Sequence, residues 1–472
     1  MNENELNVNE EALELLHNHN FVELKKILAE MNPADIAVLF EELTVNELVI
    51  VFRLLPKDLA ADTFVEMEAD HQQALIHSFS DAELREVMDE LYLDDTVDII
   101  EEMPANVVKK ILRNTDATTR KLINDLLKYP EDSAGSIMTI EFVSLRKSMT
   151  VSEALTRIRR TGVDKETIYT CYVTESNNKL IGMVTAKTLL LADEDDLIED
   201  IMETNVIFVN TLTDKEEVAG YFDKYHFLAI PVTDDEGRLV GIVTVDDAIE
   251  VMTDEATEDI EKMAAITPGE KPYLRTGVFE TYKSRIPWLL LLMISAAFTA
   301  NIISSFESAL SACVVLTSYI PMIMATGGNS GSQSSVTIIR SLSLNDISMK
   351  DIFRILWKES RVALLCGFTL GVANFIKMMI FDKGTIVASI AAGLPEIVAV
   401  SPLYAALIVS FVVCITIVLT VFTAKVVGCS LPLLAKRLGF DPTVMANPFI
   451  TTIVDALSLV VYFKVAALML GI

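Results

Sequence analysis

The chain has 472 residues, a formal net charge of −29 and 51% hydrophobic residues, although 22% of its residues are charged. Residues 1–270 hold 58 acidic and 23 basic residues, a net charge of −35, whereas residues 271–472 hold 9 and 15, a net charge of +6. The acidic half excludes nucleic-acid partners, because phosphate contacts require a basic face. A surface rich in carboxylates suits cations instead.

The N-terminus is acidic and polar, so it lacks the pattern of a cleaved signal peptide. The cysteines are widely spaced and form no C-x-x-C pair; they are Cys171, Cys313, Cys366, Cys414 and Cys429. This pattern favours neither a disulfide framework nor a zinc site. We therefore expect the acidic half to remain in the cytoplasm.

Helix-start signals recur in residues 1–130 at a spacing of about 24 residues. The signals are Pro33, Pro56, Ser80 and Pro104, and each precedes apolar residues at the helical period. Proline near the first turn and serine at the N-cap are favourable helix starts. Short repeats filled with helices are typical of a superhelical array, so residues 1–130 are predicted to form an acidic, all-α solenoid domain.

The next part of the chain contains an internal duplication. The sequence KLIGMVT at 179–185 recurs as RLVGIVT at 238–244. Each copy has the pattern of a helix, a short apolar strand, a turn, a second strand and a helix. We predict two α/β units, over residues 131–200 and 201–252, that pack as a pseudo-symmetric pair.

Carboxylates are stacked on one face of the segment that follows this pair. On a helix, Asp247, Glu250, Asp254 and Glu258 are separated by three or four residues, and like charges at this spacing repel. A bound divalent cation would relieve the repulsion, but a solvated acidic linker explains the spacing equally well. The segment leads into the first apolar run, so residues 253–283 are predicted to form an amphipathic connecting helix.

Residues 284–472 contain five apolar runs that are long enough, at about 20 residues each, to cross a bilayer as helices. The predicted spans of this all-α transmembrane domain are about 287–306, 312–339, 361–381, 397–424 and 443–470. The loops predicted on one side, which include Lys425, carry twelve Lys and Arg, whereas the others carry only Lys377 and Lys383. Basic loops stay in the cytoplasm, so the N-terminus is predicted to be cytoplasmic and the C-terminus outside.

Two features interrupt the apolar character of these spans. The run Gly327–Ser335 is rich in Gly, Ser and amide side chains, which favours irregular backbone lining a wet cavity; a helix-packing face of small residues is the alternative. Asp455 is a carboxylate within the last span, and such residues are functional candidates. An interfacial ion pair with Lys464 is the alternative for Asp455.

Asn447, Thr451 and Asp455 are separated by four residues each and share one helix face, which offers only oxygen ligands. Ligation by oxygen without His or Cys suits Mg²⁺ or Ca²⁺ better than zinc or copper. One Asp supplies little charge for a dication. A homodimer about a two-fold axis would supply two.

Several motifs together resemble the MgtE family of bacterial magnesium channels. They are the tandem α/β units, which look like CBS domains, the junction YPEDSAGSIMT at 129–139, the run GGNSGSQ at 327–333, and the spaced Asp441-Pro442, Asn447-Pro448 and Asp455. The resemblance covers almost the whole chain. It implies a homodimer in membrane lipid with ten membrane helices around one pore on the two-fold axis. It also implies a plug helix over about residues 253–275.

The resemblance also implies roles for individual residues. Asp455 would hold hydrated Mg²⁺ in the pore, with Asn329 and Asn447 nearby. The cytosolic Mg²⁺ sensor would consist of Asp94, Asp95, Asp214, Glu216, Asp247, Glu250, Glu255, Glu258 and Asp259. Family members often carry an acid where this chain has His226, so one regulatory metal position is expected to be weaker or sensitive to protons.

Nucleotide-binding CBS units usually carry a Thr-x-x-Asp motif. The second unit has this motif as Thr244 and Asp247, whereas the first has Thr185 followed by Thr188 in place of the Asp. The resemblance therefore implies ATP as a cofactor at the second unit, and the missing Asp disfavours it at the first.

The sequence thus predicts a Mg²⁺-selective channel of the bacterial inner or plasma membrane, which carries Mg²⁺ inward and is closed by cytosolic Mg²⁺. The alternatives are a membrane-anchored CBS sensor of nucleotides or ions, and a broader divalent-cation transporter. An intramembrane serine protease is excluded, because every His lies in the acidic half and leaves a membrane serine without a base. The chain has no G-x-x-x-x-G-K-[ST] loop, which argues against an energy-coupled pump. We expect a channel and not an enzyme.

Overall fold

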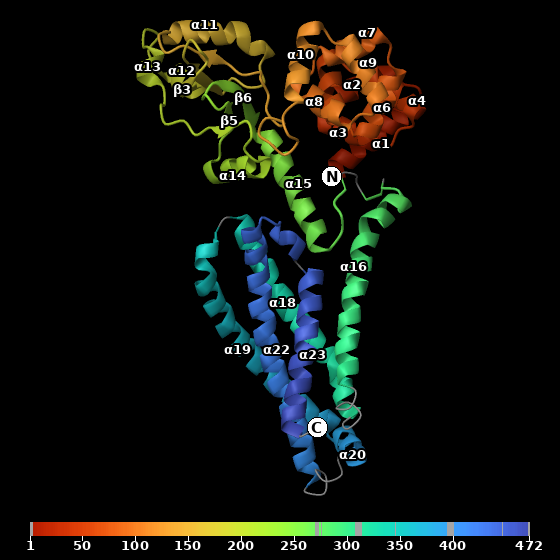
Figure 1. Ribbon diagram of the computed structural model, residues 1–472. Helices are drawn as coiled ribbons and strands as arrows, with labels where there is room; N and C mark the ends of the chain where they lie inside the picture. Colours follow the sequence, from red (N-terminus) through yellow and green to blue (C-terminus); the bar gives the residue numbers. More distant parts are fainter. Residues whose placement is uncertain are drawn as a thin grey trace. The chain divides into compact units, whose positions relative to one another are not determined.

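The computed structural model describes residues 3–269, 273–274, 276–306, 314–344, 346–393, 401–445 and 447–470. The chain divides into two compact units, Met1–Thr253 and Asp254–Ile472. The first unit combines short helices with two small sheets, and the second unit is built from helices (Figure 1).

Short helices fill the first part of unit 1. They are α1 Glu3–His17, α2 Phe21–Glu30, α3 Pro33–Phe40, α4 Val45–Phe52, α5 Lys57–Val65, α6 Ala69–Ser78, α7 Asp81–Met88, α8 Leu93–Glu102, α9 Ala105–Asn114 and α10 Ala117–Leu126. The predicted starts are confirmed, because Pro33 opens α3, and Pro56, Ser80 and Pro104 directly precede α5, α7 and α9. Ser80 forms a capping box with Glu83, which satisfies backbone N–H groups at the start of α7. The superhelical form of the array stays a prediction.

The duplicated segment folds into two equivalent three-stranded sheets. The first contains β1 Ser144–Leu145, β2 Thr170–Thr174 and β3 Leu180–Thr185, and the second contains β4 Val209–Asn210, β5 Ala229–Thr233 and β6 Leu239–Thr244. In each sheet the first pair of strands is parallel and the second pair antiparallel. The accompanying helices are α11 Val151–Thr161, α12 Ala186–Leu191, α13 Ile198–Ile201 and α14 Lys215–Tyr225, with a 3-10 turn at Gly162–Asp164.

A glycine in each sheet allows the two copies to pack in the same way. A Cβ atom at Gly182 would lie 2.8 Å from the sulfur of Met202, and a Cβ atom at Gly241 would lie 2.7 Å from the sulfur of Met138. Both distances are shorter than Cβ atoms normally show, so a side chain at either position would force the facing methionine to move. The segment that precedes each copy therefore packs on the sheet of the other copy, as a pseudo-symmetric pair requires.

Helix α15, Val245–Met263, follows the second sheet and carries the stacked carboxylates. The helix that was expected over 253–275 is wrong in its extent, because α15 ends at Met263. Pro268 and Gly269 follow this end and disfavour a continued helix. The next helix begins at Val278.

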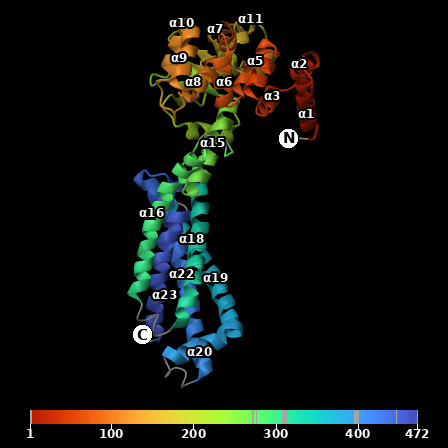
Figure 2. The same ribbon diagram turned by 90° about the vertical axis from the view of Figure 1, so that its right-hand side faces the viewer.

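Unit 2 is dominated by long helices. They are α16 Val278–Ser305, α18 Ile320–Ser343, α19 Ile352–Lys377, α20 Lys383–Gly393, α22 Pro402–Leu438 and α23 Asn447–Leu470. Short turns lie at η2 Val314–Tyr319, η3 Met349–Asp351, η4 Met378–Asp382, which is a π-helix, and η5 Pro442–Met445. In both views α18, α22 and α23 run side by side (Figures 1 and 2).

Four helical segments of the described chain are long and apolar enough to cross a membrane. They are Val278–Ser305, Met349–Ala391, Pro402–Leu438 and Pro448–Leu470. Helix α18 does not pass this test of apolarity, because it contains many Gly, Ser and Thr residues. The predicted number of five membrane helices therefore stays a prediction.

The irregular backbone that was expected over Gly327–Ser335 is wrong, because α18 runs through this segment without a break. Its small residues form a packing face instead. A Cβ atom at Gly331 would lie 2.9 Å from Ile450 of α23, and one at Gly428 of α22 would collide with the backbone carbonyl of Gly331. Small side chains at such positions let helix backbones approach closely, which was the alternative interpretation.

The count of basic loop residues placed Lys425 in a loop, but in the structure Lys425 lies in a helix. Helix α22 continues to Leu438, and Lys425 is buried within it, with 5% of its surface exposed. The neighbouring helix α19 likewise begins at Ile352, before the predicted start of its span. The predicted orientation across the membrane thus loses part of its support.

Candidate cation-binding sites

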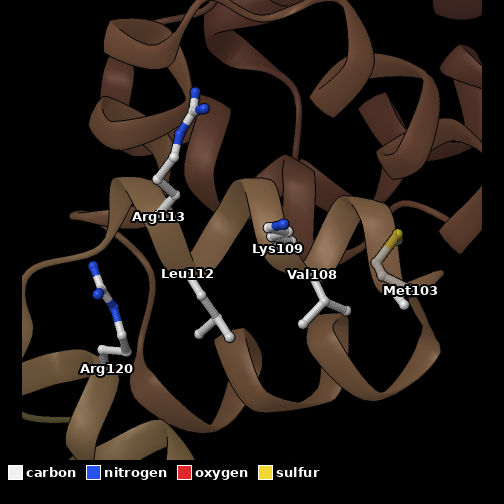
Figure 3. Close-up of a pocket in the computed structure, with 7 residues that line it drawn as sticks. Met103, Val108, Lys109, Leu112, Arg113 and Arg120 are labelled. Atoms are coloured by element: carbon white, nitrogen blue, oxygen red, sulfur yellow. The ribbon is translucent and has the colours of Figure 1, made fainter.

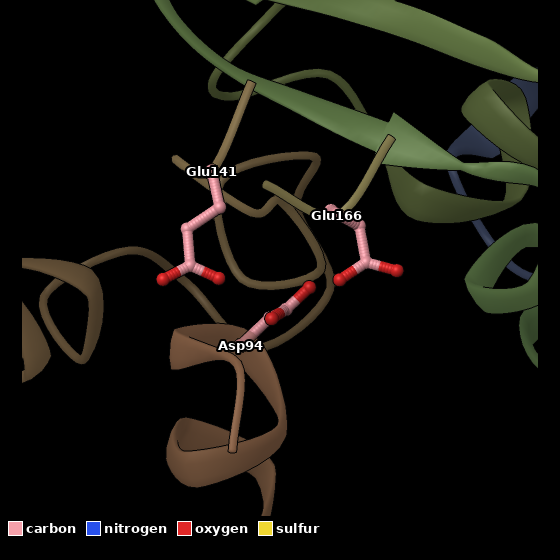
Figure 4. Close-up of side chains that lie close together, drawn as sticks. All are labelled: Asp94, Glu141 and Glu166. Carbon is pink, nitrogen blue, oxygen red and sulfur yellow. The ribbon is translucent and has the colours of Figure 1, made fainter. Parts of the chain in front are cut away.

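Three carboxylates of unit 1 come together from separate parts of the chain. Asp94 lies in the first turn of α8, and Glu141 and Glu166 lie in segments between regular elements. One oxygen atom from each side chain lies within 4.8 Å of the others, and the backbone N–H of Glu166 donates to the carbonyl of Glu141. Figure 4 shows Asp94 pointing from its helix toward the two glutamates. These three residues are called the acidic trio below.

Burial raises the free energy of the ionised acidic trio unless a cation or protons neutralise its charge. Asp94 is 9% exposed, and its Oδ1 atom accepts no hydrogen bond from the described residues. Burial, and then the charge of Asp95, hold the pKa of the Asp94 carboxyl well above its usual range. Burial and the charge of Asp247 raise the pKa of Asp95 to about 7, and burial and the charge of Asp246 raise the pKa of Glu166 to about 8. Three converging oxygen ligands suit a hard dication such as Mg²⁺.

Asp247 acts on the acidic trio and Asp95 from the first turn of α15, and these five residues are called the acidic region below. The charge of Asp247 raises the pKa values of Asp94, Asp95 and Glu166. Its carboxylate accepts a hydrogen bond from the hydroxyl of Thr244, which lies at the end of β6. Of the predicted sensor residues, Asp94, Asp95 and Asp247 are therefore brought together, and Glu250 is an exposed neighbour whose charge acts on Asp98.

Asp214 and Glu216 lie elsewhere in unit 1. Asp214 caps α14 by accepting a hydrogen bond from the backbone N–H of Glu216, at 2.9 Å. It also lines a hollow of about 330 Å³ with Asn210 and Tyr221. Neither Asp214 nor Glu216 belongs to the acidic trio, which is the group of closely spaced ligand atoms found in the described chain.

The remaining predicted sensor residues belong to the end of α15 in unit 2. Glu258 forms an ion pair with Lys262 at 2.6 Å, and Lys262 forms a second one, at 2.9 Å, with Asp441. Burial and the charge of Asp441 raise the pKa of Asp259. Glu255 lies on the same helix. Lysine thus supplies a positive charge to carboxylates that were predicted to bind metal.

Asp455 lies in α23, on the side that packs against the glycines of α18. Its Oδ1 atom is buried and accepts no hydrogen bond within the described chain, although the residue as a whole is only half-buried. A Cβ atom at Gly328 would lie 3.0 Å from Thr451 and 3.7 Å from Asp455 Oδ1. The absence of a side chain at Gly328 therefore leaves space beside this carboxylate.

The other predicted pore residues are distributed differently. Thr451 is half-buried one turn before Asp455, as the shared helix face requires. Asn329 is exposed on α18, next to the buried Gly328. Asn447 is the first residue of α23, and its side chain lies outside the described part of the structure.

A hollow of about 600 Å³ on α9 and α10 has the opposite chemistry (Figure 3). Val108 and Leu112 are among its apolar lining residues, and its polar lining consists of Lys109, Arg113 and Arg120. Three cationic side chains disfavour a divalent cation, so this hollow is not a candidate metal site.

Comparison with known families divides the chain in the same way as its motifs. The profile described as the MgtE divalent cation transporter matches residues 320–465, and the profile of the MgtE intracellular N domain matches residues 31–132. The profile of the CBS domain matches twice, at residues 134–195 and 198–254.

Two relatives and one solved structure resemble the chain over long stretches. The magnesium transporter MgtE of Thermus thermophilus is 36% identical over 95% of this chain and 95% of its own length. The magnesium transporter MgtE of Bacillus subtilis is 30% identical over 96% and 95%. The crystal structure of the soluble part of a magnesium transporter is 31% identical, covers 53% of this chain and 99% of its own, and superposes with a TM-score of 0.50.

Proposed function

This chain belongs to the MgtE family of divalent cation transporters, and from that premise we propose that it carries Mg²⁺ inward across a bacterial membrane. The observation that carries the proposal is Asp455, a carboxylate with an unsatisfied buried oxygen atom among long apolar helices. A carboxylate in that environment is retained for a function rather than for packing. The proposal includes a homodimer that places two copies of Asp455 about one pore.

The chemistry of Mg²⁺ explains why few protein ligands are needed. Mg²⁺ gives up its inner water molecules reluctantly and demands octahedral geometry, so a pore would hold it through its water shell. Two Asp455 carboxylates would balance the charge of the ion, and Asn329, Asn447 and Thr451 would accept hydrogen bonds from its waters. Neutral acceptors keep the ion bound weakly enough to leave.

The membrane potential provides the driving force. A dication entering a cell gains about 4.6 kcal/mol per 100 mV of inside-negative potential, which is twice the figure for a single charge. The inward direction of flux is consistent with the proposed topology, in which the N-terminus is cytoplasmic and the C-terminus is outside.

We also propose that the chain is divided into five domains, over residues 1–130, 131–200, 201–252, 253–283 and 284–472.

Substitution of Asp455 tests the pore in the full chain reconstituted in liposomes. Asp455→Asn keeps the size of the side chain but removes its charge, so we expect Mg²⁺ uptake to be abolished or sharply reduced. Asp346→Asn is a matched control, because Asp346 is an exposed acid of the same unit. Uptake by Asp455→Asn equal to that of the wild type would overturn the pore assignment.

We propose further that cytosolic Mg²⁺ closes the channel by binding carboxylates of unit 1 and α15. The acidic trio and Asp247 repel one another when no cation is bound, and a dication would favour the arrangement in which they converge. Such a ligand shifts a conformational equilibrium only by its differential affinity for the two states. Helix α15 carries Asp247 in its first turn and Lys262 in its last, so it is the element through which the signal would pass.

The gate is tested by Mg²⁺ flux at different Mg²⁺ concentrations on the side of unit 1. Asp94→Asn combined with Glu166→Gln removes two charges of the acidic region without changing side-chain size. We expect the half-inhibiting Mg²⁺ concentration to rise by about tenfold, a typical coupling between sites. The control is Asp89→Asn with Glu90→Gln, since both are exposed acids of unit 1. Unchanged inhibition in the first variant would refute this gate.

We propose ATP as a ligand of the second CBS unit only. Thr244 and Asp247 are hydrogen-bonded there, whereas Thr185 pairs with Thr188 at the corresponding place in the first unit. Because Asp247 also belongs to the acidic region, ATP and Mg²⁺ would influence one another's binding. Titration of the full chain with ATP should show weaker binding by Thr244→Ala; equal affinity would exclude the site.

A further inference from the structure

Three polar side chains from three helices of unit 2 meet inside the helix bundle. They are Ser334 of α18, Glu359 of α19 and Lys425 of α22. The Ser334 hydroxyl donates a hydrogen bond to Glu359 Oε2 at 2.7 Å, and Lys425 Nζ donates one to Ser334 Oγ at 3.1 Å. The ammonium and carboxylate groups are 3.7 Å apart, and their side chains are 7% and 14% exposed. Glu359 and Lys425 are called the buried ion pair below, and Ser334 bridges them.

Close packing of the helices does not require this ion pair. Gly428 packs on the backbone of Gly331, and this close approach of α22 to α18 involves no polar side chain. Removing two charged groups from water costs several kcal/mol each, and apolar residues of similar size often stabilise a bundle as well or better. In some proteins such buried charged groups are retained because they fix one arrangement of the packed helices. A role beyond packing therefore accounts for the ion pair.

Ser334 connects the buried ion pair with Asp455, because it lies on α18. Ser334 follows Gly328 by six residues, or about 9 Å along a helix. Gly328 faces Asp455 of α23, whereas Ser334 is held by α19 and α22. The same helix thus carries Gly328, which leaves space beside Asp455, and Ser334, which the buried ion pair holds. A rotation of α18 about its axis would change both together.

We propose that Ser334, Glu359 and Lys425 are positioning residues that fix the rotation of α18 and thereby shape the Mg²⁺ site at Asp455. The inference rests on the proposed function, in which Asp455 lies in the pore. The ion pair holds α18 through directional hydrogen bonds from two neighbouring helices, which apolar contacts alone do not provide. Mg²⁺ depends on this precision, because its octahedrally arranged waters donate hydrogen bonds in fixed directions to the protein acceptors.

Flux measurements on the full chain in liposomes test the proposal, with the apparent KM for Mg²⁺ and the ratio of Mg²⁺ to Co²⁺ uptake as readouts. Glu359→Gln should raise the KM by about tenfold, within the range of coupling found in one hydrogen-bond network, and should alter the ratio. A purely structural role would lower the yield of folded protein but leave both quantities unchanged. Lys358→Met, an exposed lysine on the same helix, is the control.

Two further variants keep the test decisive if Glu359→Gln does not fold. Glu359→Gln combined with Lys425→Met leaves no unpaired buried charge, so it should fold, yet still show the raised KM. The exchange of Glu359→Lys with Lys425→Glu should return the KM toward the wild-type value. A wild-type KM and ratio in the neutral double variant would overturn the proposal.

The outcome of Asp455→Asn separates this proposal from the one on which it rests. If that variant conducts normally, the pore assignment itself is wrong. If it loses uptake while Glu359→Gln and the neutral double variant keep a wild-type KM and ratio, the pore assignment stands and the positioning role alone is refuted.

Discussion

At the scale of single residues, the acidic region gives unit 1 an unusual dependence on pH. The raised pKa values of Asp94, Asp95 and Glu166 mean that the folded state binds protons that the unfolded state releases above about pH 4. The resulting stabilisation is complete below that pH, and it is lost as the pH rises through about 7 to 8, the values of Asp95 and Glu166.

We therefore expect α8 to be less protected from hydrogen exchange at pH 9 than at pH 6 in the metal-free full chain, after correction for intrinsic rates. Mg²⁺ should abolish the difference, because a bound dication replaces the protons. Asp94→Asn should also reduce it. Equal protection at both pH values without metal would show that these carboxylates are not buried together.

Sequence patterns located only part of this site. Asp94 and Asp95 were identified through the resemblance to a family, and Asp247 through its spacing on a helix. Glu141 and Glu166 were missed, because both lie in irregular segments where no periodicity marks a residue as facing inward. The pairing of Glu359 with Lys425 was missed for a similar reason, since long helices bring together residues far apart in the chain. Only tertiary packing reveals such pairs.

At the scale of elements, the contact of α18 with α22 depends on glycine. Gly428→Ala would place a methyl group against the carbonyl of Gly331, so we expect it to destabilise unit 2 by about 1–3 kcal/mol. The measurement is thermal unfolding in detergent, together with Mg²⁺ uptake, which should fall. Gly384→Ala in α20 is the control, because the added carbon meets no atom of another described segment within 4 Å. Equal melting temperatures would contradict this packing.

Helix boundaries could be predicted where local chemistry decides them. Pro33 and Ser80 start helices because proline and a capping side chain suit a first turn, and both starts are confirmed. The run Gly327–Ser335 was misjudged, because its residues have low helix propensity when considered alone. Packing against α22 and α23 overrides that propensity, and no local pattern reports such packing.

At the scale of the whole molecule, the uneven charge of the chain anticipated its division. The acidic half corresponds closely to the unit that ends at Thr253, and the nearly uncharged half to the unit of long helices. If unit 1 closes the channel when it binds Mg²⁺, a chain that lacks residues 1–253 should transport Mg²⁺ at low cytosolic Mg²⁺. Its transport should continue at about millimolar cytosolic Mg²⁺. If Mg²⁺ still inhibits this shortened chain in liposomes, the inhibitory site lies in unit 2.

The central claim is that Mg²⁺ is a cargo held beside Asp455 through its water shell. Anomalous scattering from crystals of the full chain grown with Mn²⁺ tests it most directly, because Mn²⁺ occupies sites for Mg²⁺ and can be located by itself. We expect a peak about 4 to 5 Å from the Asp455 carboxylate, the length of a metal–water bond followed by a hydrogen bond. Peaks at other carboxylates with none near Asp455 would contradict the claim.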